Sequence, residues 1–256
     1  TCPMTLQHGG KDPYTPNGST LVYRKLREMK VPAELHLYPD KGHGAFGFER
    51  CVEFMKQMGY MGEVPEEERL MDRYTCDDAR GFYAKENIWP EGRTPDLQQE
   101  QCVPYIEWHI PANLTTKAIQ IVYSGGAYYG NNPDDFEVAP IRRYLNEKGM
   151  AVVTLKYRTP RPVTVAKHTT AWQDLQRAIR LVRSQAAEYG LDPDKIGIMG
   201  GSAGGHLAST IATHAESDAK PNFQILVYPV ITMDPAFTHM GSHNNLLGKN
   251  AKKKQE

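Results

Sequence analysis

The stretch "IGIMGGSAGGHLASTIATHA" (residues 196–215) sets the fold class, because an apolar run leads directly into a glycine-rich turn and then a helical pattern. Its centre reads Gly200-Gly201-Ser202-Ala203-Gly204, which matches the Gly-x-Ser-x-Gly pattern of a nucleophile elbow. Flanking glycines let the turn close where larger side chains would clash. The strained turn predicts that the Ser202 hydroxyl stands clear of the sheet, at the positive end of the following helix.

Strand and helix patterns alternate on both sides of this turn. Apolar strand patterns cover 2–8, 33–39, 105–111, 118–126, 151–158, 195–201 and 223–230, and helical spacing covers 18–30, 49–59, 137–148, 170–189 and 203–215. Strands separated by helices of this length form βαβ units. The sequence therefore predicts an α/β fold with a mostly parallel central sheet flanked by helices.

The composition is that of an ordinary globular protein. The 256 residues are 40% apolar and carry 30 basic and 30 acidic side chains, so there is no basic excess that would favour nucleic acid. Apolar runs such as 223–231 are too short to span a bilayer. No signal-peptide pattern is present, but the chain begins at Thr1 rather than Met, so export is left open.

The cysteines give no metal or redox motif. Cys2, Cys51, Cys76 and Cys102 are scattered without a Cys-x-x-Cys pair, which argues against a zinc ribbon or a thioredoxin-type site. A bridge between Cys76 and Cys102 is left open.

A second glycine-rich loop follows the strand at 118–123, in "YSGGAYYGNNP". Gly125 and Gly126 let backbone N–H groups converge without obstruction by side chains. Together with the N–H of Ala203 they are predicted to form an oxyanion hole. Tyr128 and Tyr129 either line an acyl or sugar pocket or pack within the loop.

A serine nucleophile needs a histidine base and a carboxylate that orients it. His43 lies in "YPDKGHGAFGF" (38–48), on a Gly-His-Gly turn after a strand, and is the predicted base. Six of the other histidines sit within strands or helices, or at positions where packing is the expected role: His8, His109, His206, His214, His239 and His243.

Two aspartates compete for the role of the acid. Asp12, in "HGGKDPYTP" (8–16), follows a strand that would adjoin the strand leading to His43, so both loops would leave the same edge of the sheet. Asp40 is nearer in sequence, but it lies inside the histidine's own turn and reaches the ring poorly. We predict Asp12. Its alternative role is that of a turn-forming Asp-Pro.

With its segments reordered, the chain resembles bacterial α/β-hydrolase carbohydrate esterases, including acetylxylan and feruloyl esterases. The resemblance covers most of the chain, in "IVYSGGAYYG", "AVVTLKYR", "GLDPDKIGIMGGSAGGHLAS", "YPVITMDPAFTHMGSHNNLLGKN", "HGGKDPYTPNGS" and "VPAELHLYPDKGHGAFGF". Such enzymes run in the order Ser, Asp, His, whereas this chain runs Asp12, His43, Ser202. The order implies a single circularly permuted domain over 1–256, or half-domains that complete each other's sites between chains.

In the permuted interpretation, 1–60 corresponds to the usual C-terminal part, 61–74 is a linker that joins the old termini, and 75–256 corresponds to the usual N-terminal part. The resemblance implies Asp12 as the acid, His43 as the base, and no metal or cofactor. It implies removal of acetyl or feruloyl groups from plant xylan by a secreted or periplasmic bacterial protein. The predicted partner is an acylated plant polysaccharide, with neither nucleic acid nor membrane, and a homodimer is left open. A prolyl-oligopeptidase-like peptidase and a catalytically silent carbohydrate-binding protein remain alternatives.

Overall fold

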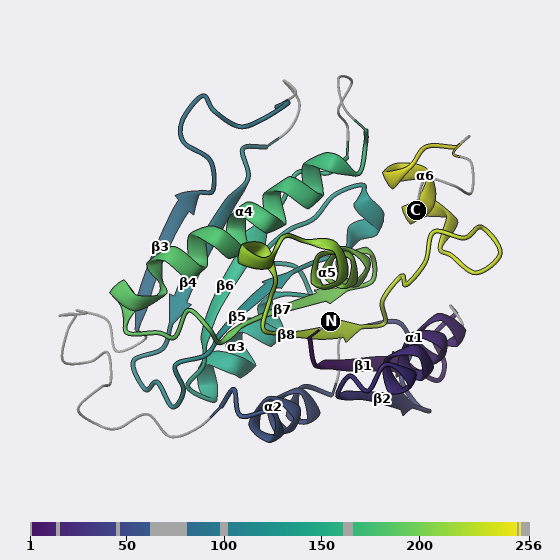
Figure 1. The fold of residues 1–256 in the computed structure, drawn as a ribbon, viewed down its shortest axis with the longest axis horizontal. Coiled ribbons are helices and arrows are strands. Elements are labelled where there is room, and N and C mark those ends of the chain that lie inside the picture. Colours follow the sequence, from purple (N-terminus) through teal and green to yellow (C-terminus); the bar gives the residue numbers. More distant parts are fainter. Residues whose placement is uncertain are drawn as a thin grey trace.

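The computed structural model describes residues 2–13, 16–44, 47–61, 81–97, 102–160, 166–249 and 251. This part of the chain forms one eight-stranded sheet in the order β2-β1-β8-β7-β5-β6-β4-β3, shown in Figure 1. The strands are β1 (Met4–Gly9), β2 (Ala33–Tyr38), β3 (Phe82–Asn87), β4 (Tyr105–Ile110), β5 (Ile119–Tyr123), β6 (Ala151–Lys156), β7 (Ile196–Gly201) and β8 (Phe223–Val227). β4 runs opposite to the other strands of the sheet, so its pairings with β3 and β6 are antiparallel. The predicted α/β fold with a mostly parallel sheet is therefore confirmed.

Helices cover both faces of the sheet. They are α1 (Asn17–Glu28), α2 (Phe48–Gln57), α3 (Ala139–Glu147), α4 (Thr169–Gln185), α5 (Ala203–His214) and α6 (Met240–Leu246), with 3-10 turns η3 (Gly126–Tyr128), η4 (Ala186–Tyr189) and η5 (Ser217–Ala219). One core contains residues of α1, α4 and α5, and a second contains residues of α2 and α3. Along β5, Ile121 joins the first core and Val122 the second, so the strand is apolar on both faces, as a buried parallel strand must be.

The first two strands of the chain lie at one edge of the sheet, beside the last strand. β1 pairs in parallel with both β2 and β8, and β8 pairs in parallel with β7. Gly9 aligns with Tyr38, so β1 and β2 end at the same level. Because carboxyl ends of parallel strands meet at one edge of a sheet, the loops after β1, β2, β7 and β8 emerge together. This topology, rather than nearness in sequence, sets the position of the site.

Three elements differ from the sequence-based expectations. β3 was not predicted; its alternating half-buried and exposed residues form an edge strand on β4. α6 was not predicted either, although His239 accepts the N–H of Ser242 and so begins this short helix. β8 ends at Val227 rather than at 230, because Tyr228 takes φ 35°. Apart from Met61, the predicted linker lies outside the described residues, as does Cys76; Cys102 is a free thiol.

A buried ion pair joins the segment after β6 to α4. Arg158 and Asp174 are both fully buried, and their Nη2 and Oδ1 atoms lie 2.7 Å apart. The Asp174 carboxylate also accepts the Arg158 backbone N–H at 2.9 Å and the Trp89 indole N–H at 2.9 Å. Each polar group is therefore partnered, which is the condition under which a buried charge pair is tolerated.

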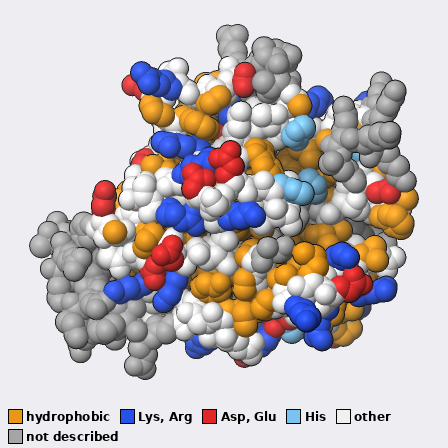
Figure 2. Space-filling view, viewed as in Figure 1, with side chains coloured by type: hydrophobic (Ala, Val, Ile, Leu, Met, Phe, Trp, Pro, Cys, Tyr) orange, Lys and Arg blue, Asp and Glu red, His pale blue; other side chains and the backbone are white. Residues whose placement is uncertain are grey.

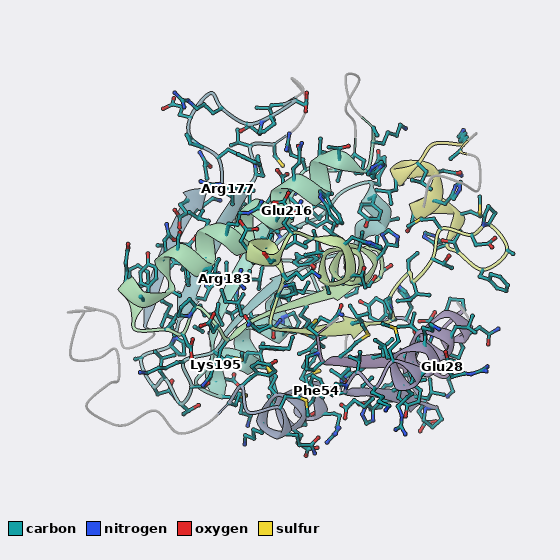
Figure 3. All side chains as sticks on the ribbon, in the orientation of Figure 1. Glu28, Phe54, Arg177, Arg183, Lys195 and Glu216 are labelled. Atoms are coloured by element: carbon teal, nitrogen blue, oxygen red, sulfur yellow. The ribbon has the colours of Figure 1, made fainter. Side chains whose placement is uncertain are left out.

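Arginines on α4 tie this helix to the loops around it (Figure 3). Arg177 donates through Nε to the Ile88 carbonyl at 2.8 Å, and Arg183 donates through Nη2 to the Lys220 carbonyl at 2.8 Å. In the described part of the chain, no helix is long and apolar enough to cross a membrane.

Candidate active site

The turn after β7 has the strained geometry that the Gly-x-Ser-x-Gly pattern predicts. Ser202 takes φ 51° and ψ −118° and stands directly before α5. A Cβ at Gly200 would lie 2.4 Å from the Gly204 carbonyl carbon, so only glycine lets the strand and helix approach this closely. Such a strained non-glycine residue at the start of a helix places its hydroxyl at the helix's positive end.

His43 and Asp12 meet at the neighbouring edge of the sheet. The His43 Nδ1 lies 2.9 Å from Asp12 Oδ2, and the Asp12 side chain is fully buried whereas 30% of the His43 side chain is exposed. His8 lies on the other side of the carboxylate, with its Nε2 3.6 Å from Asp12 Oδ2. Asp40 is 91% exposed and faces Lys11 at 4.0 Å. Of the two candidate acids, the structure brings Asp12 to the histidine.

Close backbone packing brings the two loops together. A Cβ on Gly9 would lie 2.3 Å from the Gly42 carbonyl oxygen, so a side chain there would separate the loops. The N–H of Gly10 donates to the Tyr38 carbonyl at 2.7 Å, and the N–H of Lys11 donates to the Lys41 carbonyl at 2.8 Å. The glycines of the His-Gly-Gly element therefore permit the contact between Asp12 and His43.

Tyr228 connects this pair to the elbow. Its ring centroid lies 4.2 Å from that of His43, and the rings are tilted by 51°. The Ser202 N–H donates to the Val227 carbonyl at 3.0 Å, and the Val230 N–H donates to the Ser202 carbonyl at 2.9 Å. Ser202 is thus hydrogen-bonded to Val227, just before Tyr228, and to Val230, shortly after it, and Tyr228 is the residue that contacts His43. The three predicted catalytic residues lie at one end of the sheet.

The predicted oxyanion loop packs directly on the elbow. A Cβ at Gly125 would lie 2.8 Å from the Ala203 nitrogen and 2.9 Å from Ser202 Cβ, which leaves no room for a side chain. Gly126, Ala127 and Tyr128 all have φ between 51° and 58°, a strained run for the two residues that are not glycine. Strain of this kind persists only where surrounding contacts hold the backbone.

Those contacts come from three directions. The buried Tyr157 hydroxyl donates to the Ser124 carbonyl at 2.9 Å and lies 3.1 Å from the Gly125 carbonyl. The Asn245 side-chain amide, from α6, donates to the Ala127 carbonyl at 2.9 Å. The Gly125 N–H donates to Glu137 Oε2 at 2.7 Å. The loop is therefore fixed before any substrate binds.

One predicted oxyanion residue is placed differently from the expectation, and Tyr128 takes the second of the two roles left open for it, packing within the loop. The N–H of Gly125 is occupied by Glu137, so it does not face an open site. Tyr128 is only 2% exposed, and its hydroxyl lies 2.8 Å from His206 Nδ1, so it supports the loop from inside. Tyr129 is 70% exposed. In the described residues, Gly126 and Ala127 N–H groups have no protein acceptor.

The remaining histidines take the packing roles expected of them or lie at the surface. Burial lowers the pKa of His206 to about 4, and burial together with the nearby Arg142 lowers that of His109 to about 4. His243 is buried in α6, and His214 is exposed at the end of α5. Among the described residues, no three His, Cys, Asp or Glu side chains are grouped to hold a metal ion.

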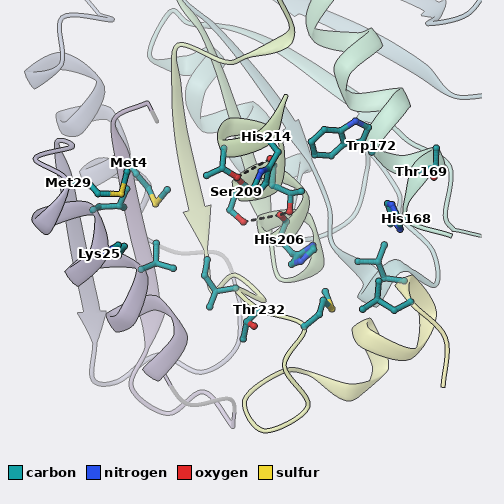
Figure 4. Close-up of a pocket in the computed structure, with 18 residues that line it drawn as sticks. Met4, Lys25, Met29, His168, Thr169, Trp172, His206, Ser209, His214 and Thr232 are labelled. Carbon is teal, nitrogen blue, oxygen red and sulfur yellow. Dashed lines mark hydrogen bonds between the residues drawn. The ribbon is translucent and has the colours of Figure 1, made fainter. Parts of the chain in front are cut away.

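A large cavity lies to one side of these groups. It has a volume of about 920 Å³ and is lined mainly by α1, α4, α5 and α6, with Met4, Trp172, His206 and Thr232 among the lining residues (Figure 4). Figure 2 shows a hydrophobic surface with histidines beside it in this region. None of Asp12, His43 and Ser202 lines this cavity, so its size does not identify the place of the chemistry.

Glu137 and Tyr228 are the site residues that sequence reasoning missed. Glu137 lies in a polar stretch before α3 and Tyr228 in a Tyr-Pro-Val stretch after β8, and neither has a recognisable catalytic spacing. The one sequence feature that could have indicated Glu137 is an acidic residue after a glycine-rich strand end, and that feature alone does not indicate a function.

The fold and the elbow define an α/β-hydrolase. The solved structure of an acetyl ester-xyloside bifunctional hydrolase from Caldicellulosiruptor lactoaceticus agrees, with a TM-score of 0.56 and 29% identity over 66% of this chain and 65% of that one. Residues 107–244 match the BD-FAE family model. The chain belongs to the BD-FAE family.

Two curated relatives are similar over a shorter part of their own length. An acetylxylan esterase from Xylanibacter ruminicola is 37% identical over 141 residues, 55% of this chain and 28% of the relative. Endo-1,4-beta-xylanase B from Butyrivibrio fibrisolvens is 29% identical over 202 residues, 75% of this chain and 31% of the relative. The chain thus spans about a third or less of each.

Proposed function

We propose that this chain hydrolyses carboxylic esters through an acyl-serine intermediate. Ser202 attacks the ester carbonyl, His43 takes the hydroxyl proton and passes it to the leaving alcohol, and Asp12 orients the imidazole. Water then attacks the acyl-serine with His43 again as the base. The observation that carries the proposal is the 2.9 Å contact between His43 and the buried Asp12, beside a serine held at φ 51°.

The oxyanion of the tetrahedral intermediate is assigned to the N–H groups of Gly126, Ala127 and Ala203. Gly126 and Ala203 were predicted from the sequence, and Ala127 takes the place of Gly125, because the Gly125 N–H already donates to Glu137. Preformed donors are worth more in catalysis than donors that reorganise, and the bonds from Tyr157 and Asn245 hold this loop in advance.

We propose acetyl or feruloyl esters of plant xylan as the substrates. The relatives named acetylxylan esterase and acetyl ester-xyloside bifunctional hydrolase, which are 37% and 29% identical to this chain, support the acetyl ester. The exposed Tyr129 ring, next to the oxyanion loop, is proposed to contact the acyl or sugar part. Aromatic faces are a common surface for such groups.

Product release tests the substrate class. The purified chain is incubated with acetylated xylan and with feruloylated xylan, and acetate and ferulate are measured against a Ser202→Ala control. Release of either that depends on Ser202 supports the proposal. Cleavage of Pro-containing peptides without release of acid from xylan would indicate a peptidase instead. Retained sugar binding without labelling by a fluorophosphonate probe would indicate a catalytically silent binding protein.

We also propose that the segments form one circularly permuted domain, with 1–60 in the usual C-terminal role and 75–256 in the usual N-terminal role. The parallel pairing of β1 with β8 supports this arrangement. Mixing Ser202→Ala with His43→Ala tests it. Recovered activity would mean that sites form between chains, as in a homodimer, and would exclude the single-chain arrangement. Persistent inactivity beside an active wild type is the expected result.

A further inference from the structure

Glu137 is a buried carboxyl group that the catalytic triad does not use. It is 6% exposed and lies just before α3. Asp135 fixes the start of this segment, because its Oδ1 accepts the Glu137 N–H at 2.9 Å and the Val138 N–H at 3.2 Å. Burial of a carboxyl group is costly unless its oxygens are bonded, so the partners of this side chain indicate its role.

Both Glu137 oxygens are bonded to parts of the proposed site. Oε2 accepts the Gly125 N–H at 2.7 Å, and Oε1 accepts the Tyr228 hydroxyl at 2.6 Å. The same oxygen lies 2.8 Å from the place that a Cβ on Gly201 would occupy. Gly201 immediately precedes Ser202. The carboxyl group therefore lies directly beneath the nucleophile elbow, between the oxyanion loop and Tyr228.

Tyr228 extends this contact to the base. Its N–H donates to the Gln7 carbonyl on β1 at 2.7 Å, and its φ of 35° turns the chain at the end of β8. Its ring lies against His43 with 4.2 Å between the centroids. One end of Tyr228 is thus fixed by Glu137, and the ring contacts the imidazole.

We propose that Glu137 is a positioning residue for ester hydrolysis, which fixes the oxyanion loop through Gly125 and the His43 ring through Tyr228. The inference rests on the proposed function of Ser202, His43 and Asp12. By accepting the Gly125 N–H, the carboxyl group fixes the orientation of the backbone just before Gly126 and Ala127. A carboxyl group suits this place because each of its two oxygens can accept from one of two separate donors, which no neutral side chain of this length does.

The test uses Glu137→Gln, with Glu147→Gln, an exposed glutamate at the end of α3, as the matched control. The Gln amide has one accepting oxygen, for which the Gly125 N–H and the Tyr228 hydroxyl compete, and its NH2 group can donate to the hydroxyl but cannot accept the Gly125 N–H. For p-nitrophenyl acetate we expect kcat to fall about 10- to 100-fold with KM within about 3-fold, since small displacements of aligned groups cost rate rather than binding. Fluorophosphonate labelling should slow in parallel, and Glu147→Gln should match the wild type.

Tyr228→Phe separates positioning from packing, because it keeps the ring against His43 and removes only the hydroxyl. We expect kcat to fall about 3- to 10-fold, by loss of one of the two bonds that hold Glu137. In the double variant Glu137→Gln/Tyr228→Phe, the tyrosine hydroxyl no longer competes for the Gln oxygen, which can then accept the Gly125 N–H. The double variant should therefore be more active than Glu137→Gln alone. If Glu137 contributed only to stability, the double variant would show no such rescue, and kcat per labelled site would not change in either single variant.

The outcomes distinguish the inference from the proposed function. Wild-type kcat per labelled site in both Glu137→Gln and Tyr228→Phe would overturn the positioning role while leaving the triad in place. A wild type that is neither active on p-nitrophenyl acetate nor labelled by the probe would overturn the proposed function itself. If Glu137→Gln melts below the assay temperature, Tyr228→Phe decides, since it leaves the buried carboxyl in place.

Discussion

Replacing Asp12 by Asn removes the charge that faces His43 while keeping nearly the same shape. In the proposed mechanism His43 becomes an imidazolium in the transition state, and the carboxylate stabilises that charge from 2.9 Å. With an effective dielectric of about 20, two unit charges at this distance attract by about 6 kcal/mol. Solvent reaches 30% of His43 and weakens the attraction, and Asn still accepts one hydrogen bond. A loss of about 3–5 kcal/mol corresponds to a fall in kcat of about 10²- to 10⁴-fold.

The assay is the initial rate on p-nitrophenyl acetate, with kcat referred to protein that circular dichroism shows to be folded. Asp40→Asn is the matched control, because Asp40 is 91% exposed and an exposed charge contributes little. We expect its kcat to stay within about 2-fold of the wild type. An Asp12→Asn protein with nearly full kcat, or a larger loss in Asp40→Asn, would refute the assignment of the acid.

Three further predictions concern the scaffold. Asp174→Asn leaves the Arg158 charge buried without its counter-charge, so urea denaturation should show a loss of about 3–5 kcal/mol; a loss below about 1 kcal/mol would contradict the reasoning. Gly125→Ala places a methyl group 2.8 Å from the Ala203 nitrogen, so kcat should fall about 100-fold, whereas Gly130→Ala, with open space around it, should stay active. His206 titrates near pH 4 in the native state and near 6.5 when unfolded, so the unfolded state binds more protons between these values. His206 should therefore contribute a fall in the free energy of unfolding of up to about 1.4 kcal/mol per pH unit from pH 6.5 to 4, and His206→Gln should reduce the slope by that contribution in denaturation at pH 7, 5.5 and 4.5.

Local sequence patterns predicted the parts of the fold that depend on residues close together in the sequence. The strand, turn and helix around Ser202 lie within twenty residues, and their pattern predicts both the elements and the strained serine that the structure has. β3 was missed because it is a half-exposed edge strand, and α6 because it is short and contains Gly241. Their patterns are weak, since packing against neighbours rather than propensity stabilises them.

The sequence by itself determined the α/β class, the elbow and the choice of His43 and Asp12 as the residues to examine. Only the tertiary structure showed that Glu137 and Tyr228, 91 residues apart, bond to each other beneath the elbow, and that Gly125 gives its N–H to Glu137. The physical reason is the distance along the sequence between the residues that determine each feature. A turn or a helix is encoded by residues a few positions apart, whereas the partners of a buried carboxyl depend on strand order, on register and on which loops leave the same edge of the sheet.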